Sequence, residues 1–581
     1  AYSYTLELLL YNYDVKGEPY VYKSNSNVYE YAWKENYYNI SAHSEYDKRI
    51  GDHHFKTMVG FQVENTAYRD LSAQRDGILV PGQPVLNLTS GTDNNGNTVV
   101  PAVTGQYQNW ANAGFFGRIN YDYADKYLIE GNLRYDGSSR FRADSRWGWF
   151  PSVSAGWNIS KEKFFTDNVS FVNYLKLRAS YGELGNQNTT DWYPTYVLLP
   201  VGITNGAWLI NNTRPNTASA AGLVSSTLTW ESINTLNAGI DFGLLNNRLT
   251  GSFEVFKRKT LDMVGPAPQL PAVLGTQVPQ TNNTDLETKG FEATIGWTDR
   301  TEGGFRYSTK FLVSDYSTTV TNYPNKTGSL DEDTYRTGQR LGEIWGYTTI
   351  GIAKSQQEMD AHLASLPNGG QNDLGSQWGA GDIMYKDLNG DGKIGSGSST
   401  ESNPGDRSII GNSTPRYSFG FNFNGDYKNF DFSLFLQGVM KRDYWQGGYY
   451  FWGATSNKWW STGLKEHEDY FRTADNALGE NLDAYYARPI FGTDKNQQAQ
   501  TRYLQNAAYI RIKNIQVGYT VPMETTKRFG ISKLRVYISG ENVWTGSKVA
   551  GMYDPETIDG GSNGTVYPLT KVWSAGLSAT F

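Results

Sequence analysis

The chain has 581 residues, a formal net charge of −6 and only 38% hydrophobic residues, a low apolar share for a soluble protein with one large core. Its 52 basic and 58 acidic residues nearly balance, which argues against a nucleic-acid-binding protein. No stretch approaches the ~18 consecutive apolar residues of a membrane-spanning helix. Cysteine is absent, which excludes a disulfide framework and favours a place outside the cytoplasm.

The first clear strands alternate between apolar and polar residues. In FFGRINYDY, every second residue from Phe115 to Tyr123 is aromatic, aliphatic or glycine, and the polar residues Arg118, Asn120 and Asp122 lie between them. After the short turn 124–126, the segment YLIEGNLRYD alternates in the same way. Period-two segments of about ten residues joined by a short turn predict a β-hairpin with one apolar and one polar face.

The same alternation continues to the end of the chain. Further predicted strands are NAGIDFGLL with LTGSFEVF, GFEATIGW with FRYSTKFLV, RYSFGFNFN with NFDFSLFLQ, and KLRVYISGENVW. The segment IRIKNIQVGYTVP changes parity near Lys513 and Asn514, which predicts a bulge. Counting such segments predicts roughly sixteen strands.

The connections alternate between short turns and long loops. Turns at 124–126, 245–248 and 425–428 alternate with long segments at 66–113, 183–233, 257–287, 317–414, 441–505 and 546–569. Outer-membrane barrels combine short periplasmic turns with long outside loops, whereas a soluble sandwich has loops of similar length at both ends. The sequence therefore predicts an all-β fold, a transmembrane antiparallel β-barrel over residues 1–581. The alternative is a soluble sandwich, propeller or solenoid, although no repeat of propeller or solenoid length occurs.

A barrel also explains the composition and the end of the chain. Its outer face meets lipid and its inner face meets water, so half of each strand is polar. Aromatic residues near strand ends are expected to form interfacial girdles: Tyr121, Tyr123, Tyr127, Tyr135, Trp149 and Trp157. In the terminal KVWSAGLSATF, Trp573, Leu577 and Phe581 share one face, and we expect this strand to close the barrel.

Several stretches resemble one family. They are NLRYDGSSRF followed by RWGWFPSVSAGWNIS, LKLRASYGELGNQ, LNAGIDFGLLNNRLTGSFEVFKRKT, GDIMYKDLNGDGKI, IIGNSTPRYSFGFN, RYLQNAAYIRIKNIQVGYTVP, KLRVYISGENVW and the terminal strand. Together, and in this order, they resemble the SusC/RagA-type TonB-linked outer-membrane transporters of the Bacteroidetes, from one end of the chain to the other.

The resemblance implies a 22-stranded barrel with an N-terminal plug, driven by TonB–ExbB–ExbD, in the outer membrane of a Gram-negative bacterium. It also implies a SusD-like surface lipoprotein lid, dimers of such pairs, and an oligosaccharide or peptide cargo. The chain lacks the plug, the TonB box and about six strands of this pattern. It opens AYSYTLELLLYNY, with neither an initiator Met nor a signal peptide, so we expect a processed or truncated chain that is not competent for transport alone.

Charged residues crowd the segment RYDGSSRFRADSRWG. They are Arg134, Asp136, Arg140, Arg142, Asp144 and Arg146. We expect them mainly to pair with one another in a loop. The functional alternative is a hydrophilic wall at the mouth of a lumen.

The segment KDLNGDGKI matches the start of an EF-hand-like loop. Its candidate ligands alternate along the chain: Asp387, Asn389, Asp391 and, through its backbone carbonyl, Lys393. The twelfth position, where a bidentate Glu is expected, is Ser398. We expect either a structural Ca²⁺ or Mg²⁺ site that stiffens an outside loop, or a pair of turns that binds nothing. No other cofactor is expected.

The segment 443–463 is rich in aromatic residues, namely Tyr444, Trp445, Tyr449, Tyr450, Trp452, Trp459 and Trp460. Flat rings suit the C–H faces of sugars, so these residues are candidates for contact with substrate or lipoprotein. The alternative, which we favour for any individual residue, is mutual packing that folds the loop.

Signals of catalysis are lacking. The five histidines have no zinc-ligand spacing, and no Walker loop or nucleophile elbow occurs. We therefore expect an importer, not an enzyme, with oligosaccharide ahead of peptide as cargo and no nucleic-acid partner. The alternatives are a passive porin-like pore and a secreted carbohydrate-binding or carbohydrate-degrading β-protein.

Overall fold

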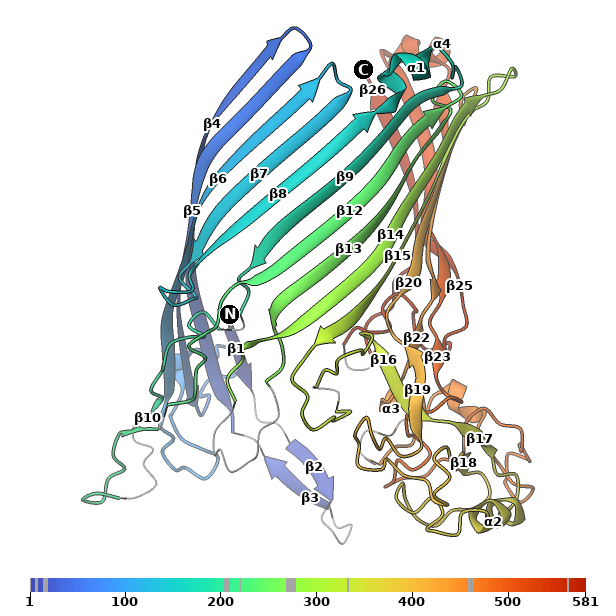
Figure 1. Cartoon of the computed structure of the whole chain (residues 1–581). Helices are drawn as coiled ribbons and strands as arrows, with labels where there is room; N and C mark the ends of the chain where they lie inside the picture. The colour runs from blue at the N-terminus through green and yellow to red at the C-terminus, as the bar shows by residue number, and fades with distance from the viewer. Residues whose placement is uncertain are drawn as a thin grey trace.

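The computed structural model describes residues 2–5, 9–13, 19–23, 25–189, 191–202, 209–219, 221–267, 278–331, 334–456, 461, 463–561 and 564–581. Within these residues, sixteen antiparallel strands form one sheet that curves into a barrel wall (Figure 1). In sheet order they are β1 (Tyr2–Thr5), β4 (Asn27–Ile50), β5 (His53–Asp76), β6 (Ala102–Tyr123), β7 (Tyr127–Ser138), β8 (Trp147–Asn158), β9 (Val172–Asn186), β12 (Glu231–Leu244), β13 (Leu249–Val264), β14 (Asn282–Arg300), β15 (Arg306–Asn322), β20 (Arg416–Tyr427), β21 (Phe430–Lys441), β24 (Tyr509–Val521), β25 (Lys533–Ser547) and β26 (Val572–Thr580). This order follows the chain and confirms the predicted fold class and strand number.

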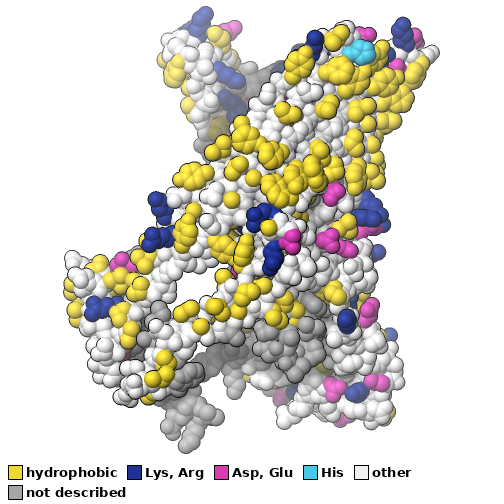
Figure 2. Space-filling view, turned by 60° about the vertical axis from the view of Figure 1, so that its left-hand side comes forward, with side chains coloured by type: hydrophobic (Ala, Val, Ile, Leu, Met, Phe, Trp, Pro, Cys, Tyr) yellow, Lys and Arg dark blue, Asp and Glu magenta, His cyan; other side chains and the backbone are white. Residues whose placement is uncertain are grey.

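The period-two pattern fixes which face of each strand points outward. In the β6–β7 hairpin, Ile119 pairs with Gly131, and the Ile119 side chain is 60% exposed. On the opposite face, the Arg118 guanidinium donates to the Asn132 side chain at 3.0 Å. Figure 2 shows hydrophobic side chains gathered over the outer surface of this wall. The sheet therefore turns its apolar face outward, as a lipid-facing barrel requires.

One end of the wall carries short turns and the other carries long loops (Figure 1). The β4–β5 hairpin turns over Gly51 and Asp52, and the β12–β13 hairpin turns over 245–248. In the second turn, Asn246 and Asn247 both have φ near +59°, a left-handed conformation that Asn tolerates well. Two connections at this end contain short helical turns: η2 (Ile159–Lys161), α1 (Lys163–Thr166), α4 (Met523–Thr526) and η6 (Lys527–Phe529).

No helix in the described residues is both long and apolar enough to cross a membrane.

The sheet has two edges. Within the described residues, β26 pairs with β25 alone, and β4 pairs with β5 and, over four residues, with β1. Trp573, Leu577 and Phe581 are all exposed. Closure of the barrel through β26 stays a prediction.

The first predicted loop, 66–113, is too long. β5 continues to Asp76 and β6 begins at Ala102, and the two pair residue by residue from His53 with Tyr123 to Gln74 with Ala102. The outer halves of these strands are polar, so the apolar alternation fades, but backbone hydrogen bonds hold the ladder without it. The predicted bulge is confirmed, because the β24–β25 register shifts between Ile512 and Asn514.

Three long loops fold together at the loop end of the wall. We name the described residues of 323–415, 442–508 and 548–571 the loop platform. Its elements are β16 (Glu343–Tyr347), β17 (Thr349–Ile352), α2 (Gln356–Ala364), β18 (Ile383–Tyr385), β19 (Arg407–Asn412), β22 (Asp443–Tyr444), α3 (Tyr449–Trp452), η5 (Lys465–Glu468) and β23 (Gln505–Asn506). Elsewhere the chain adds β2 (Leu9–Tyr13), β3 (Pro19–Lys23), η1 (Leu86–Leu88), β10 (Val201–Gly202) and β11 (Thr217–Ala218).

Candidate functional site

The inner face of the wall is polar and carries ion pairs between neighbouring strands. Arg178 on β9 contacts Glu254 on β13 at 2.7 Å and Asp241 on β12 at 3.2 Å. Residues from neighbouring strands line a hollow of about 490 Å³ on this face, among them His54, Glu130, Ser154, Lys176 and Arg178. A surface of this kind suits a water-filled lumen through which polar solutes pass.

The predicted charges Arg134 and Asp136 lie on this inner face. The Arg134 guanidinium donates to both carboxylate oxygens of Asp136, at 3.0 and 2.8 Å. Together they line a second hollow of about 300 Å³, beside Glu64 and Asn112. The expected pairing is thus present, and the pair also forms part of the lumen wall.

Arg140 and Arg146 do not pair with acids in the described part of the chain. Arg140 is buried in the β7–β8 loop, where its Nη1 donates to the Thr189 carbonyl and hydroxyl, both at 3.1 Å, and its guanidinium lies over the Trp110 ring. The Arg146 guanidinium donates to the Phe141 carbonyl. The expectation of ion pairing is therefore wrong for these two arginines, because loop carbonyls and an aromatic ring take up their donors.

Many polar groups of the KDLNGDGKI loop form hydrogen bonds within the loop itself. Asp387 accepts from the backbone N–H groups of Gly390 at 2.6 Å and Gly392 at 2.9 Å. Asn389 and Asp391 accept from the N–H groups of the residues two positions after them. Among the described residues, no group of three or more His, Asp or Glu side chains is arranged around a common metal position. The Ca²⁺ or Mg²⁺ site, including the Lys393 carbonyl, stays a prediction.

Asp406 is the buried acid of this loop that the motif did not single out. Its two carboxylate oxygens accept from the N–H groups of Leu388 and Gly395, both at 2.8 Å, and so hold the two ends of the loop together. Burial raises the pKa of Asp406 above its ordinary value, although the backbone donors oppose the shift.

Most of the predicted aromatic residues pack into the loop platform. Trp452 is buried, its ring 4.7 Å from Tyr503 between centroids, and Tyr450 meets the Tyr553 ring at 5.4 Å. Tyr444 and Trp445 are half-buried against the same core, and Tyr449 is exposed. Neighbouring rings cover most of the Trp452 side chain, and contact of these aromatic residues with substrate or lipoprotein stays a prediction. Trp459 and Trp460 lie outside the described residues.

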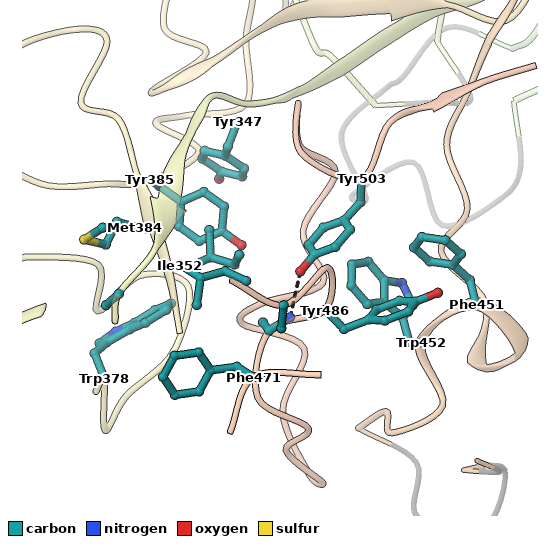
Figure 3. Packing of buried hydrophobic residues seen from close by; sticks show 14 of the residues in the cluster. Tyr347, Ile352, Trp378, Met384, Tyr385, Phe451, Trp452, Phe471, Tyr486 and Tyr503 are labelled. Carbon is teal, nitrogen blue, oxygen red and sulfur yellow. Dashed lines mark hydrogen bonds between the residues drawn. The ribbon is translucent and has the colours of Figure 1, made fainter. Parts of the chain in front are cut away.

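The loop platform has an aromatic core of its own. Figure 3 shows Tyr385 and Tyr347 on one side of this core and Phe451, Trp452, Tyr486 and Tyr503 on the other. The Ala487 N–H donates to the Tyr503 hydroxyl at 2.8 Å. Close-packed aromatic rings restrict the movement of the loops that carry them. The three loops therefore present a rigid surface.

A buried charge network joins two of these loops. Asp382 is completely buried and accepts from Arg488 at 2.6 and 2.7 Å and from the Lys495 ammonium at 2.9 Å. Burial alone would raise the pKa of Asp382, but the donors Arg488, Asn496 and Lys495 outweigh it and hold this pKa below its ordinary value. Burial lowers the pKa of Lys495. These partners are more than a hundred residues apart in sequence, so no local motif indicated them.

Comparison with known proteins places this wall and platform in a family. Residues 1–359 match the family model described as TonB dependent receptor-like, beta-barrel. The chain belongs to this family. It is thus an outer-membrane β-barrel, as the SusC/RagA resemblance indicated.

Individual relatives agree with this assignment. The chain is 27% identical to TonB-dependent receptor P3 of Formosa agariphila, over 92% of this chain and 51% of that protein. It is 28% identical to TonB-dependent receptor SusC of Bacteroides thetaiotaomicron, over 80% of this chain and 43% of that protein. The solved RagAB peptide transporter shares the fold with a TM-score of 0.74 at 20% identity, over 96% of this chain and 57% of that one. This TonB-dependent receptor barrel spans about half the length of the curated relatives it matches.

Proposed function

We propose that this chain is the barrel portion of a TonB-dependent active importer that carries nutrient oligosaccharides across the outer membrane, with a SusD-like surface lipoprotein as its lid. The observation that carries the proposal is the one-sided platform: three long loops folded round an aromatic core, above a wall whose inner face is polar. A fixed platform offers the lipoprotein lid a surface to bind, and a polar lumen lets a hydrated cargo pass.

Two other functions are less well supported. A secreted carbohydrate-binding protein would expose the wall's apolar outer face to water, at a cost that grows with each side chain such as Ile119 or Ile538. A peptide cargo suits the paired charges of the inner wall, and a peptide importer of the same family is therefore the second candidate.

Growth on defined nutrients tests the proposal. The gene for the full-length protein is deleted in its own bacterium, and the strain is grown on individual purified polysaccharides or on a peptide digest as the limiting nutrient. The proposal predicts loss of growth on at least one polysaccharide, restored by the full-length gene, and loss of uptake when a protonophore removes the energy for TonB.

Three results would contradict it. Loss of growth on the peptide digest alone would favour the peptide importer. Uptake that survives the protonophore would indicate a passive pore. Purification of the protein from detergent-extracted outer membranes with no lipoprotein present in near-equal amount would exclude the lid.

A further inference from the structure

The loop platform contains a pocket that lies apart from the barrel lumen. Its volume is about 390 Å³, within the range of small-molecule sites. All its described lining residues come from the single loop between β21 and β24, and those that matter here are Trp452, Glu468, Tyr470, Tyr486, Arg488 and Phe491.

The pocket wall is largely aromatic. Trp452 and Tyr486 meet at 70° with their ring centroids 6.4 Å apart, and Figure 3 shows them side by side in the platform core. Phe491 is 56% exposed, so the pocket opens to solvent beside the Phe491 ring. The rings of the wall are held by the core behind them, since Tyr486 also contacts Phe451 at 5.5 Å.

Polar groups without partners lie on the same wall. The Tyr486 side chain is 6% exposed, and its hydroxyl is bonded to none of the other residues that the structure describes. Arg488 binds Asp382 through Nε and Nη2, which leaves Nη1 for another acceptor. Glu468 is exposed, and within the described part of the chain only its backbone carbonyl is bonded, by the Arg472 guanidinium. The Tyr486 hydroxyl is accessible from the pocket, where water or a ligand can bond to it.

We infer that this pocket binds a saccharide ring. The exposed ring of Phe491 suits the apolar C–H face of a sugar, while the Tyr486 hydroxyl, the Glu468 carboxylate and the Arg488 guanidinium suit its hydroxyl groups. An apolar peptide side chain would fill the same volume but would cover the Tyr486 hydroxyl without bonding to it. The inference rests on the proposed oligosaccharide import and adds to it a sugar subsite on the outer loops.

Saturation-transfer NMR on the full-length protein in detergent micelles tests the inference. The probes are the methyl glycosides of glucose, galactose, mannose and N-acetylglucosamine, with N-acetyl-tryptophan amide as the apolar comparison. The variants are Tyr486→Phe, which removes only the hydroxyl, and Phe491→Ala, which removes the rim. Their matched controls are Tyr567→Phe and Tyr567→Ala, on a platform residue that is 85% exposed and lies outside the pocket.

We expect at least one glycoside to bind, roughly tenfold more weakly in Tyr486→Phe and Phe491→Ala, and unchanged in both controls. Three results would overturn the inference: no glycoside binds the natural protein, binding persists unchanged in both pocket variants, or only N-acetyl-tryptophan amide binds. None of the three touches the proposed import, because the growth experiment measures cargo through the whole protein and would still succeed.

Discussion

The barrel wall and the loop platform use the same kinds of side chains in opposite ways. On the wall, Ile119 and Ile538 point outward and are 60% and 61% exposed. In the platform, Ile394, Tyr385 and Tyr503 are completely buried. Each region keeps its apolar groups away from water. The platform does so by turning them inward, because water surrounds it, whereas the wall turns them outward, because lipid surrounds it. An exposed apolar residue thus has a different meaning in each region.

Charges differ between the two regions as well. On the wall, Arg178 and its acids face the lumen and remain partly exposed. In the platform, Asp382 is completely buried and is held by the side chains of Arg488, Lys495 and Asn496 and by the Gly379 N–H. Losing a partner should therefore cost far more in the platform than on the wall.

The largest effect should come from breaking the buried network. Asp382→Ala leaves Lys495 charged and buried, and we expect the platform to lose about 3–5 kcal/mol of unfolding free energy. Tryptophan fluorescence during thermal unfolding measures this loss, and heat-modifiable mobility on gels reports whether the barrel stays folded. The control is Asp483→Ala, which breaks an exposed pair with Lys354 and should change little. Equal losses of unfolding free energy in both variants would contradict the expected difference between the buried network and the exposed pair.

A charge placed on the lipid-facing side of the wall should have the next largest effect. Ile119→Arg places a charge on the outer face of β6, midway between the aromatic residues Phe115 and Tyr123, and we expect about 2–4 kcal/mol less stability in lipid vesicles, measured by urea unfolding. Ser154→Arg is the control, because Ser154 lines the inner hollow beside Glu130. If the lumen variant is the more damaging one, the assignment of faces is wrong.

Acid should weaken the platform through Asp382. Because the folded-state pKa lies below the ordinary value, the network's contribution is complete above about pH 4, the unfolded-state pKa of an Asp, and is lost as the pH falls through the folded-state pKa. The loss per pH unit cannot exceed about 1.4 kcal/mol for one group. Melting curves from pH 7 to pH 3 measure it. In Asp382→Asn the step should disappear, and its persistence would assign the acid sensitivity to another group.

The smallest effect should come from the aromatic girdle. Tyr135 stacks on Trp149 and Trp147, with centroid separations of 4.3 and 4.9 Å. Tyr135→Leu keeps an apolar side chain but removes the stacking, and we expect a loss of about 0.5–1.5 kcal/mol in the urea experiment. Tyr135→Phe keeps the stacking and should lose less. Equal damage from the two substitutions would show that the hydroxyl, not the ring, matters.

The wall could be predicted from sequence because its determinants are local. A period of two fixes the faces, short turns such as Asn246–Asn247 fix the hairpins, and the change of parity at Lys513 locates the bulge. The outer halves of β5 and β6 escaped prediction, since a strand above the lipid needs backbone pairing and no apolar face.

The platform could not be predicted because its contacts are distant in sequence. Asp382 meets Lys495 across more than a hundred residues, and Tyr450 meets Tyr553 across a similar distance. Composition showed that residues 443–463 are aromatic, but only the fold separates buried Trp452 from exposed Tyr449. Arg140 likewise looked like an ion-pairing residue until its loop placed carbonyl oxygens and the Trp110 ring around it.

Labelling of single cysteines on intact cells tests most directly that the wall spans the outer membrane with the platform outside. These 581 residues contain no cysteine, and any cysteine elsewhere in the full-length protein is first replaced by serine. Asp483→Cys and Tyr567→Cys lie in the platform, whereas Asp125→Cys and Lys428→Cys lie in the short turns. The full-length protein should react with a membrane-impermeant maleimide at the two platform positions at once, and at the two turn positions only after the outer membrane is permeabilised. Labelling of the turns alone, or of all four positions in intact cells, would contradict the account.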